Sequence, residues 1–140
     1  MILLDTNVLS ELVRPQPDRG VLDWLDVLDA NEVATSAITV AELLYGVARL
    51  PEGRRKQQLR AAIGELIDKD MAGRVHSFDA LAARHCADIL DKRERMGRPM
   101  SAADAQIAAI CRTLAATLAT RNTSDFEDAG IELLNPWRTG

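Results

Sequence analysis

The sequence predicts an α/β protein with a central, mostly parallel, five-stranded sheet flanked by helices. Short apolar runs alternate along the chain with segments whose apolar residues recur at helical spacing, which is typical of parallel strands joined by helices. Polar residues that favour helix N-termini follow several of these runs. The 140 residues suit a single domain spanning 1–140, and with 4% aromatic residues the core is expected to be aliphatic.

The first half of the chain is expected to form two strands and four helices. Residues 2–4 are fully apolar, which is typical of a strand buried on both faces. Pro15 and Pro17 interrupt the helical spacing that follows, and Asp18 is placed to cap the next helix. These patterns place strands at 2–4 and 32–36 and helices at 8–13, 18–28, 40–48 and 54–68.

The second half is expected to form three strands and two helices. Asp79 and Ser101 are placed to cap the helices, and a loop at 96–100 separates them. Cys86 and Cys111 lie in Ala-rich helical surroundings without a metal-binding spacing, so buried free thiols in a reducing compartment are expected. The strands are expected at 73–78, 116–120 and 130–134, and the helices at 80–95 and 101–114.

Charge and hydropathy limit the class of protein. A formal net charge of −4 disfavours a plain nucleic-acid-binding module, but it allows an enzyme that meets phosphates through bound cations. No apolar run approaches the roughly 18 residues of a membrane span, and no basic segment precedes the N-terminal apolar run. A cytoplasmic protein without membrane contact is therefore expected. The densest positive run is either an RNA-backbone contact or a solvated helix face, and it comprises Arg49, Arg54, Arg55, Lys56 and Arg60.

Four acidic residues share one position relative to the predicted sheet. Asp5 directly follows the first strand, and Glu42 follows the second. Asp104 lies in the first turn of the helix before the fourth strand, and Asp125 lies just past that strand. Because the carboxyl ends of parallel strands open onto one edge, these carboxylates are expected to lie together there.

Helix capping is the alternative explanation for three of these acids. Asp5 is a preferred N-cap residue, Thr39-x-x-Glu42 has the form of a capping box, and Ser101-x-x-Asp104 has a related form. Carboxylates that meet at one edge repel each other and lose solvation. Mg²⁺ removes that cost, because it prefers oxygen ligands and is typically held by a few carboxylates beside substrate phosphates.

Five motifs in this order carry a family resemblance. They are Leu3-Leu4-Asp5-Thr6-Asn7-Val8-Leu9, Ser36-Ala37-Ile38-Thr39-Val40-Ala41-Glu42-Leu43, Ala103-Asp104-x-x-Ile107-Ala108, Ala119-Thr120-Arg121-Asn122-x-x-Asp125-Phe126 and Asn135-Pro136-Trp137. Together they resemble PIN-domain ribonucleases, and in particular the VapC-type, FitB-like toxins of type II toxin–antitoxin systems. The resemblance covers nearly the whole chain, from Met1 to Trp137.

This resemblance implies a PIN-like three-layer sandwich and Mg²⁺- or Mn²⁺-dependent endonucleolytic cleavage of RNA by metal-activated water. It carries the catalytic and metal-ligand roles onto Asp5, Glu42, Asp104 and Asp125, with Asn122 as the alternative to Asp125. It further implies a homodimer and a cognate antitoxin that covers the acidic site, commonly with an arginine.

Further residues are expected to support this site. Thr6, Asn7, Thr120 and Asn122 would orient the ligands or hold a water. Arg98 and Arg121 are candidate contacts for nucleic acid because they lie in or beside the motifs.

Two other functions use the same residues and stay open. They are a non-catalytic metal- or nucleic-acid-binding module and a DNA-associated regulator of the same fold. A haloacid-dehalogenase-type phosphatase is disfavoured, because that class needs Asp where Asp5-Thr6-Asn7 has Asn. His76 and His85 lack a partner pattern, so structural roles are expected for both.

Overall fold

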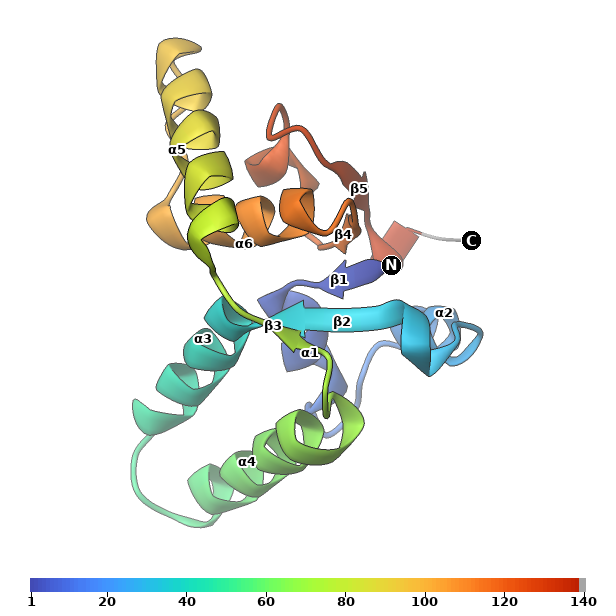
Figure 1. Cartoon of the computed structure of the whole chain (residues 1–140). Coiled ribbons are helices and arrows are strands. Elements are labelled where there is room, and N and C mark those ends of the chain that lie inside the picture. Colours follow the sequence, from blue (N-terminus) through green and yellow to red (C-terminus); the bar gives the residue numbers. More distant parts are fainter. Residues whose placement is uncertain (139–140) are drawn as a thin grey trace.

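Five parallel strands form the centre of the fold (Figure 1). The structure is a computed structural model that describes residues 1–138. The strand order is β3-β2-β1-β4-β5, so the first strand of the chain lies in the middle of the sheet. Leu3 pairs with Ala34 on one side and with Leu118 on the other. The strands are β1 (Ile2–Leu4), β2 (Val33–Ser36), β3 (Val75–His76), β4 (Thr117–Ala119) and β5 (Glu132–Leu134).

Helices cover both faces of the sheet, which confirms the three-layer α/β prediction. Helices α5 and α6 lie on one face, and α1, α3 and α4 lie on the other (Figure 1). Successive side chains of a strand point to opposite faces, and Leu3 and Leu4 accordingly enter two different buried clusters. The helices are α1 (Thr6–Leu12), α2 (Arg19–Asp26), α3 (Ala37–Ala48), α4 (Arg54–Glu65), α5 (Ala80–Arg95) and α6 (Ala102–Thr113). Four shorter helical segments are η1 (Ala30–Glu32), η2 (Leu66–Asp70), η3 (Thr123–Phe126) and η4 (Pro136–Arg138).

The core is aliphatic, as predicted from the few aromatic residues. Cys86 and Cys111 are buried free thiols within the cluster under α5 and α6. Trp24 and Trp137 pack against the other cluster, whereas Tyr45 is 65% exposed and takes no part in either. Within residues 1–138, no helix combines the length and the apolar character needed to span a membrane.

The predicted capping box at Glu42 is wrong. Helix α3 begins at Ala37 rather than at residue 40, because Ser36 caps it: Ser36 Oγ accepts the Thr39 N–H at 3.1 Å. Glu42 therefore lies in the second turn of α3, where its carboxylate cannot satisfy a free N–H of the first turn. The predicted caps at Asp18, Asp79 and Ser101 are confirmed.

Several predicted elements are shorter than expected, and two of them change in character as well. The helix at 54–68 is α-helical only to Glu65, and a π-helical turn, η2, follows it. The strand at 73–78 is reduced to β3, a two-residue edge strand. Neither change affects the central strands that carry the acidic residues.

The central strands bring distant segments together at their carboxyl ends. In the register of β1 and β4, Leu4 pairs with Ala119, and the Asp5 N–H then donates to the Ala119 carbonyl at 3.0 Å. Asp5 and Thr120, the residues after the two strands, are consequently neighbours although 115 positions separate them in the sequence. This edge of the sheet is the place where the sequence predicts the acidic site.

Candidate active site

An open pocket of about 400 Å³ lies at the carboxyl ends of the central strands. Three of the four predicted acidic residues line it, namely Asp5, Glu42 and Asp104. Four of the predicted supporting residues line it too, namely Thr6, Asn7, Arg121 and Asn122. The predicted convergence of these segments is therefore seen in the structure. The remaining wall is formed by Ser10, Glu11, Arg14 and Trp137.

Asp5 is the most deeply buried carboxylate of the pocket, at 5% exposure. Its Oδ1 accepts the Thr6 N–H at 2.8 Å, so Asp5 caps α1 as well as lining the pocket. Its Oδ2 accepts the Thr120 hydroxyl at 2.8 Å and the Asn7 side-chain amide at 3.4 Å. Capping and site membership were alternative explanations for Asp5 in the sequence, and the structure combines them.

The electrostatic surroundings of Asp5 disfavour its charged form. Burial, together with the nearby Asp104 and Glu42 carboxylates, raises the pKa of Asp5 to about 6. The hydrogen bonds from Thr120 and Thr6 act in the opposite direction. A buried carboxylate with a raised pKa beside other acids is a candidate for a functional residue.

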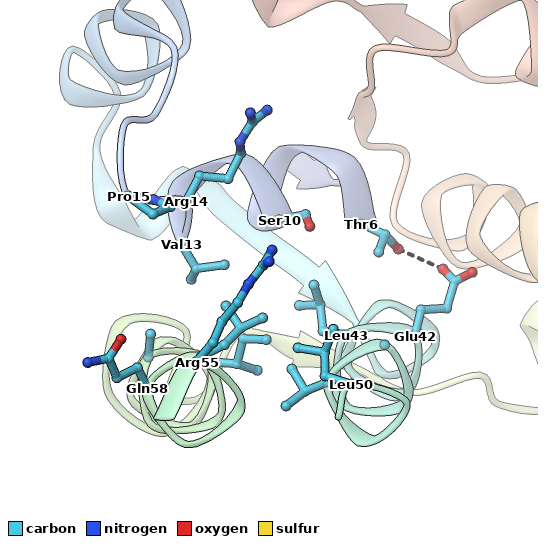
Figure 2. Close-up of a pocket in the computed structure, with 15 residues that line it drawn as sticks. Thr6, Ser10, Val13, Arg14, Pro15, Glu42, Leu43, Leu50, Arg55 and Gln58 are labelled. Atoms are coloured by element: carbon cyan, nitrogen blue, oxygen red, sulfur yellow. Dashed lines mark hydrogen bonds between the residues drawn. The ribbon is translucent and has the colours of Figure 1, made fainter. Parts of the chain in front are cut away.

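Glu42 is held by hydroxyl groups rather than by the helix backbone. The Thr6 hydroxyl donates to Glu42 Oε1 at 2.6 Å (Figure 2). Thr6 Oγ1 also lies 3.2 Å from Thr39 Oγ1, which lies 3.3 Å from Ser36 Oγ. Because a carboxylate only accepts, the Thr6 proton points to Glu42, and Thr39 in turn donates to Thr6. A chain of hydroxyls from the end of β2 thus orients an exposed acid.

Asp104 occupies the first turn of α6, where its N–H donates to Ser101 Oγ at 3.1 Å. Burial raises the pKa of Asp104, and the Asp125 and Glu42 carboxylates add to this effect. The hydrogen bond with Ser101 and the charge of Arg93 lower it. Asp125 lies in η3, where it is exposed, and it does not line the pocket. Its charge is nevertheless close enough to raise the pKa of Asp104.

Arg93 holds the segment that carries Asp125. This arginine is buried, and its guanidinium donates to the carbonyls of Arg98, Asp125 and Glu127 at 2.8–2.9 Å. Arg98 does not reach the pocket, because its guanidinium forms ion pairs with Glu127 and Asp128 at 3.3 and 3.2 Å. Its role as a nucleic-acid contact stays a prediction, whereas Arg93 is a structural residue.

Sequence reasoning missed several residues of the pocket wall. Glu11 is buried on α1, where its carboxylate accepts the Asp18 N–H at 2.9 Å and pairs with Arg14 at 3.3 Å. Glu11 is a structural acid that joins α1 to the start of α2. In the sequence, only its charge among the apolar residues of the first helix could have indicated a special role. Trp137 reaches the pocket from beyond β5, which no local pattern indicates.

The model of the PIN domain family matches residues 2–132. The chain belongs to the PIN-domain family. It is 42% identical to VapC ribonuclease Y4jK of Sinorhizobium fredii over 137 residues, covering 98% of each chain. It is 44% identical to toxin FitB of Neisseria gonorrhoeae over 137 residues, covering 98% of this chain and 99% of that one.

Solved structures of complexes share the fold of this PIN domain. The crystal structure of FitAcB from Neisseria gonorrhoeae superposes with a TM-score of 0.92 at 44% identity, covering 99% of this chain and 100% of that one. The crystal structure of VapBC2 from Rickettsia felis, bound to a DNA fragment from its promoter, gives 0.82 at 26% identity, covering 96% and 98%. Fold and family are thus established over the whole length of the PIN domain.

The donor chemistry of the pocket fits a hard divalent cation. Asp5, Glu42 and Asp104 offer oxygen donors, and burial together with neighbouring negative charge raises the pKa of Asp5 and of Asp104. Among residues 1–138, however, no three His, Cys, Asp or Glu side chains are close enough to hold one ion by themselves. Mg²⁺ accepts such a site, because it usually keeps several waters and needs only one or two carboxylates.

A second, larger hollow of the PIN domain, whose lining side chains Figure 2 shows, adjoins the acidic pocket. It is a groove of about 620 Å³ between α1, α3 and α4, and its lining is mainly apolar. Thr6, Ser10, Arg14 and Glu42 line both the groove and the acidic pocket, so the two hollows adjoin. Its apolar lining includes Val13, Leu43, Val47, Leu50, Leu59, Ala62 and Ile63.

Proposed function

We propose that this PIN domain is a metal-dependent endoribonuclease and the toxin of a toxin–antitoxin pair. The observation that carries the proposal is the pocket in which the buried Asp5 meets Glu42 and Asp104 at the carboxyl edge of a parallel sheet. The relatives named ribonucleases and toxins, and their complexes, support the same activity. The substrate is RNA, and hydrolysis of one of its phosphodiester bonds yields two shorter RNA strands.

Mg²⁺ or Mn²⁺ would be held directly by one or two of the Asp5, Glu42 and Asp104 carboxylates, and the remaining acids, with Asp125 or Asn122, would act through bound water. When bound, the cation supplies Lewis-acid stabilisation of the charge that develops on the phosphate and activates water. The protein does the positioning: Thr120 and Asn7 fix Asp5, and Thr6 fixes Glu42. One of the pocket carboxylates would take up the proton of the attacking water, and the raised pKa of Asp5 and of Asp104 favours such a role for either of them.

A cleavage assay tests the activity. Labelled RNA and labelled DNA are incubated with the protein, with and without Mg²⁺ or Mn²⁺. We expect RNA cleavage that requires the cation and that disappears in Asp5→Asn, while Asp91→Asn, an exposed acid on α5 paired with Arg95, cleaves like the parent. A folded Asp5→Asn protein that cleaves like the parent would contradict the site. Binding of DNA or metal without any cleavage would favour the regulator or the binding module instead.

The groove is the proposed seat of the cognate antitoxin. A mainly apolar groove that borders an acidic pocket suits a segment with apolar side chains followed by a basic one. Such a segment would cover Glu42 and Thr6, which lie at the junction of the two hollows. Inhibition would then result from occupation of the pocket. The proposal also includes a homodimer, for which exposed apolar side chains such as Leu44 and Leu81 are available.

A pair of glycine variants tests the groove. Gly46 lines it on α3, and a Cβ at this position meets nothing within 4 Å, so Gly46→Leu fills the groove without disturbing the helix. Gly64 on α4 has equally open space but does not line the groove. We expect Gly46→Leu to weaken capture of the co-expressed antitoxin while Gly64→Leu retains it, with RNA cleavage unchanged in both. Equal capture by the two variants would place the antitoxin elsewhere.

A further inference from the structure

Arg121 lies in an acidic pocket without pairing with an acid. It lines the wall together with Asp5, Glu42 and Asp104, yet within the described part of the chain it forms no ion pair with a carboxylate. Its guanidinium instead lies 5.0 Å from the centroid of the Trp137 ring. The other arginine of the wall, Arg14, is paired with Glu11 at 3.3 Å. Arg121 is therefore the cation of the pocket that remains available to a ligand.

The position of Arg121 is fixed by side chains from two other segments. Its N–H donates to Asn7 Oδ1 at 3.2 Å, and its carbonyl accepts Asn135 Nδ2 at 3.5 Å. Asn135 Oδ1 in turn accepts the Trp137 N–H at 2.9 Å. One asparagine side chain thus ties the arginine to the residue whose ring it stacks on. This gives the Asn135-Pro136-Trp137 motif a local structural role.

Stacking on Trp137 leaves the in-plane N–H groups of the Arg121 guanidinium free for a phosphate. A guanidinium against an indole face is held by cation–π attraction, while the N–H groups in its plane stay free to form paired hydrogen bonds with phosphate oxygens. An RNA strand entering a pocket with three carboxylates meets repulsion, and a fixed cation at the wall offsets part of it.

We propose that Arg121, stacked on Trp137 and held by Asn135 and Asn7, is a phosphate seat for the RNA strand at the edge of the acidic pocket. This inference rests on the proposed ribonuclease function and names the substrate contact of that site. It also assigns positioning roles: Trp137 and Asn135 act through Arg121 and do not themselves bind phosphate.

Salt-dependent RNA binding tests the seat. All proteins carry Asp5→Asn and are measured in EDTA with a labelled, mixed-sequence, single-stranded RNA oligonucleotide, so that no cleavage occurs. We expect Arg121→Gln to bind roughly three- to tenfold more weakly than its parent and to lose about 0.7 from the slope of log K against log salt, the value of one phosphate contact on a single strand. Arg84→Gln removes an exposed arginine of α5 outside the pocket and should leave the slope unchanged.

Two variants at Trp137 test whether RNA binding depends on the stacked position of Arg121 or only on its positive charge. Trp137→Leu keeps every charge but releases the guanidinium toward the pocket carboxylates, so the salt slope should fall as in Arg121→Gln. Trp137→Phe keeps a ring and should bind at an intermediate strength. Because Trp137 packs against the core, the folded state of both proteins is checked by thermal unfolding, and Trp137→Phe carries the test if Trp137→Leu unfolds.

The possible failures are distinguishable. An Arg121→Gln protein with the affinity and slope of its parent would overturn the seat, even if the native chain cleaves RNA with Mn²⁺. A parent that does not bind the oligonucleotide at low salt would overturn it equally. Absence of cation-dependent RNA cleavage by the native chain would instead overturn the proposed function on which the seat depends.

Discussion

The Thr6 hydroxyl donates to Glu42 Oε1 at 2.6 Å and thereby joins the first turn of α1 to the second turn of α3. Thr6→Val keeps the side-chain shape and removes this bond, so Glu42 should lose its fixed orientation. We expect metal affinity and cleavage to fall roughly 10- to 100-fold, the usual effect of losing a partner of a metal ligand. Isothermal titration with Mn²⁺ measures the affinity independently of RNA.

The matched control for this bond is Thr6→Ser, which retains the hydroxyl. It should keep most of the Mn²⁺ affinity and of the RNA cleavage. Thr6→Val that binds Mn²⁺ as tightly as the parent would show that the hydrogen bond has no positioning role.

The raised pKa of Asp5 makes the metal-free protein less stable as pH increases. Its pKa is 3.8 in the unfolded reference and about 6 in the folded state, so the folded state binds this proton more tightly. The resulting stability is fully present below about pH 4 and is lost as pH rises through about 6. At neutral pH the loss amounts to about 3 kcal/mol in the free energy of unfolding.

Asp5→Asn has no carboxyl group to titrate at this position, so it serves as the control for the pH dependence. In EDTA, urea unfolding should find the variant more stable than the parent at about pH 7.5, with the difference shrinking toward about pH 4. Mg²⁺ should stabilise the parent alone, because binding to the folded state acts by mass action. A pH-independent difference between the two proteins would contradict the raised pKa.

Variants of Asp104 and Ser101 distinguish a role in the acidic site from a role in capping α6, although both residues belong to the same turn. The cap of α6 is the Ser101 oxygen that accepts the Asp104 N–H, and this backbone group survives in Asp104→Asn. We expect Asp104→Asn to keep or slightly raise the stability of the metal-free protein, since it removes like-charge repulsion with Glu42 and Asp125. Its cation-dependent cleavage should be lost.

Ser101→Ala should behave in the opposite way. Loss of the cap costs about 1 kcal/mol of stability, and the cation-dependent chemistry should persist. Urea unfolding and the RNA assay on both proteins check this pair. A marked loss of stability in Asp104→Asn would favour the capping explanation for this acid.

Asp125 is expected to matter less than the acids that line the pocket. It is exposed in η3 and acts on Asp104 through its charge rather than from the wall. Asp125→Asn should reduce cleavage by roughly tenfold, the weaker effect of a neighbouring group. Rate measurements at several Mn²⁺ concentrations check this, and a loss as complete as that of Asp104→Asn would make Asp125 a direct ligand.

The parts of the fold that depend on local patterns could be predicted from the sequence. The apolar run before Asp5 predicted the central strand, and the parallel topology then required the acids to meet at one edge. The capping box failed because Ser36, Thr39 and Glu42 offer overlapping polar signals, and sequence alone does not decide which hydroxyl ends the strand. The structure shows that Ser36 is both the last residue of β2 and the N-cap of α3.

Contacts made at long sequence separation could not be predicted. Arg121 follows β4 and Trp137 follows β5. The two residues stack because these strands are neighbours and the segments after them both line the pocket. The structural role of Arg93 has the same origin. Its burial under three carbonyls depends on how the segment after β4 folds back onto α5, which has no local signature.

Arg93 provides the last prediction, on the loop that carries Asp125. Its guanidinium donates to the carbonyls of Arg98, Asp125 and Glu127, and Arg93→Gln would leave these acceptors without their donor. We expect a loss of about 3 kcal/mol in the free energy of unfolding, typical of breaking a buried charged hydrogen-bond network. Arg95→Gln, which removes an exposed pair with Asp91 on the same helix, should change it by less than about 0.5 kcal/mol. Urea unfolding measures both, and hydrogen exchange across 122–127 should accelerate only in Arg93→Gln; equal stability of the two variants would show that the loop is held by other contacts.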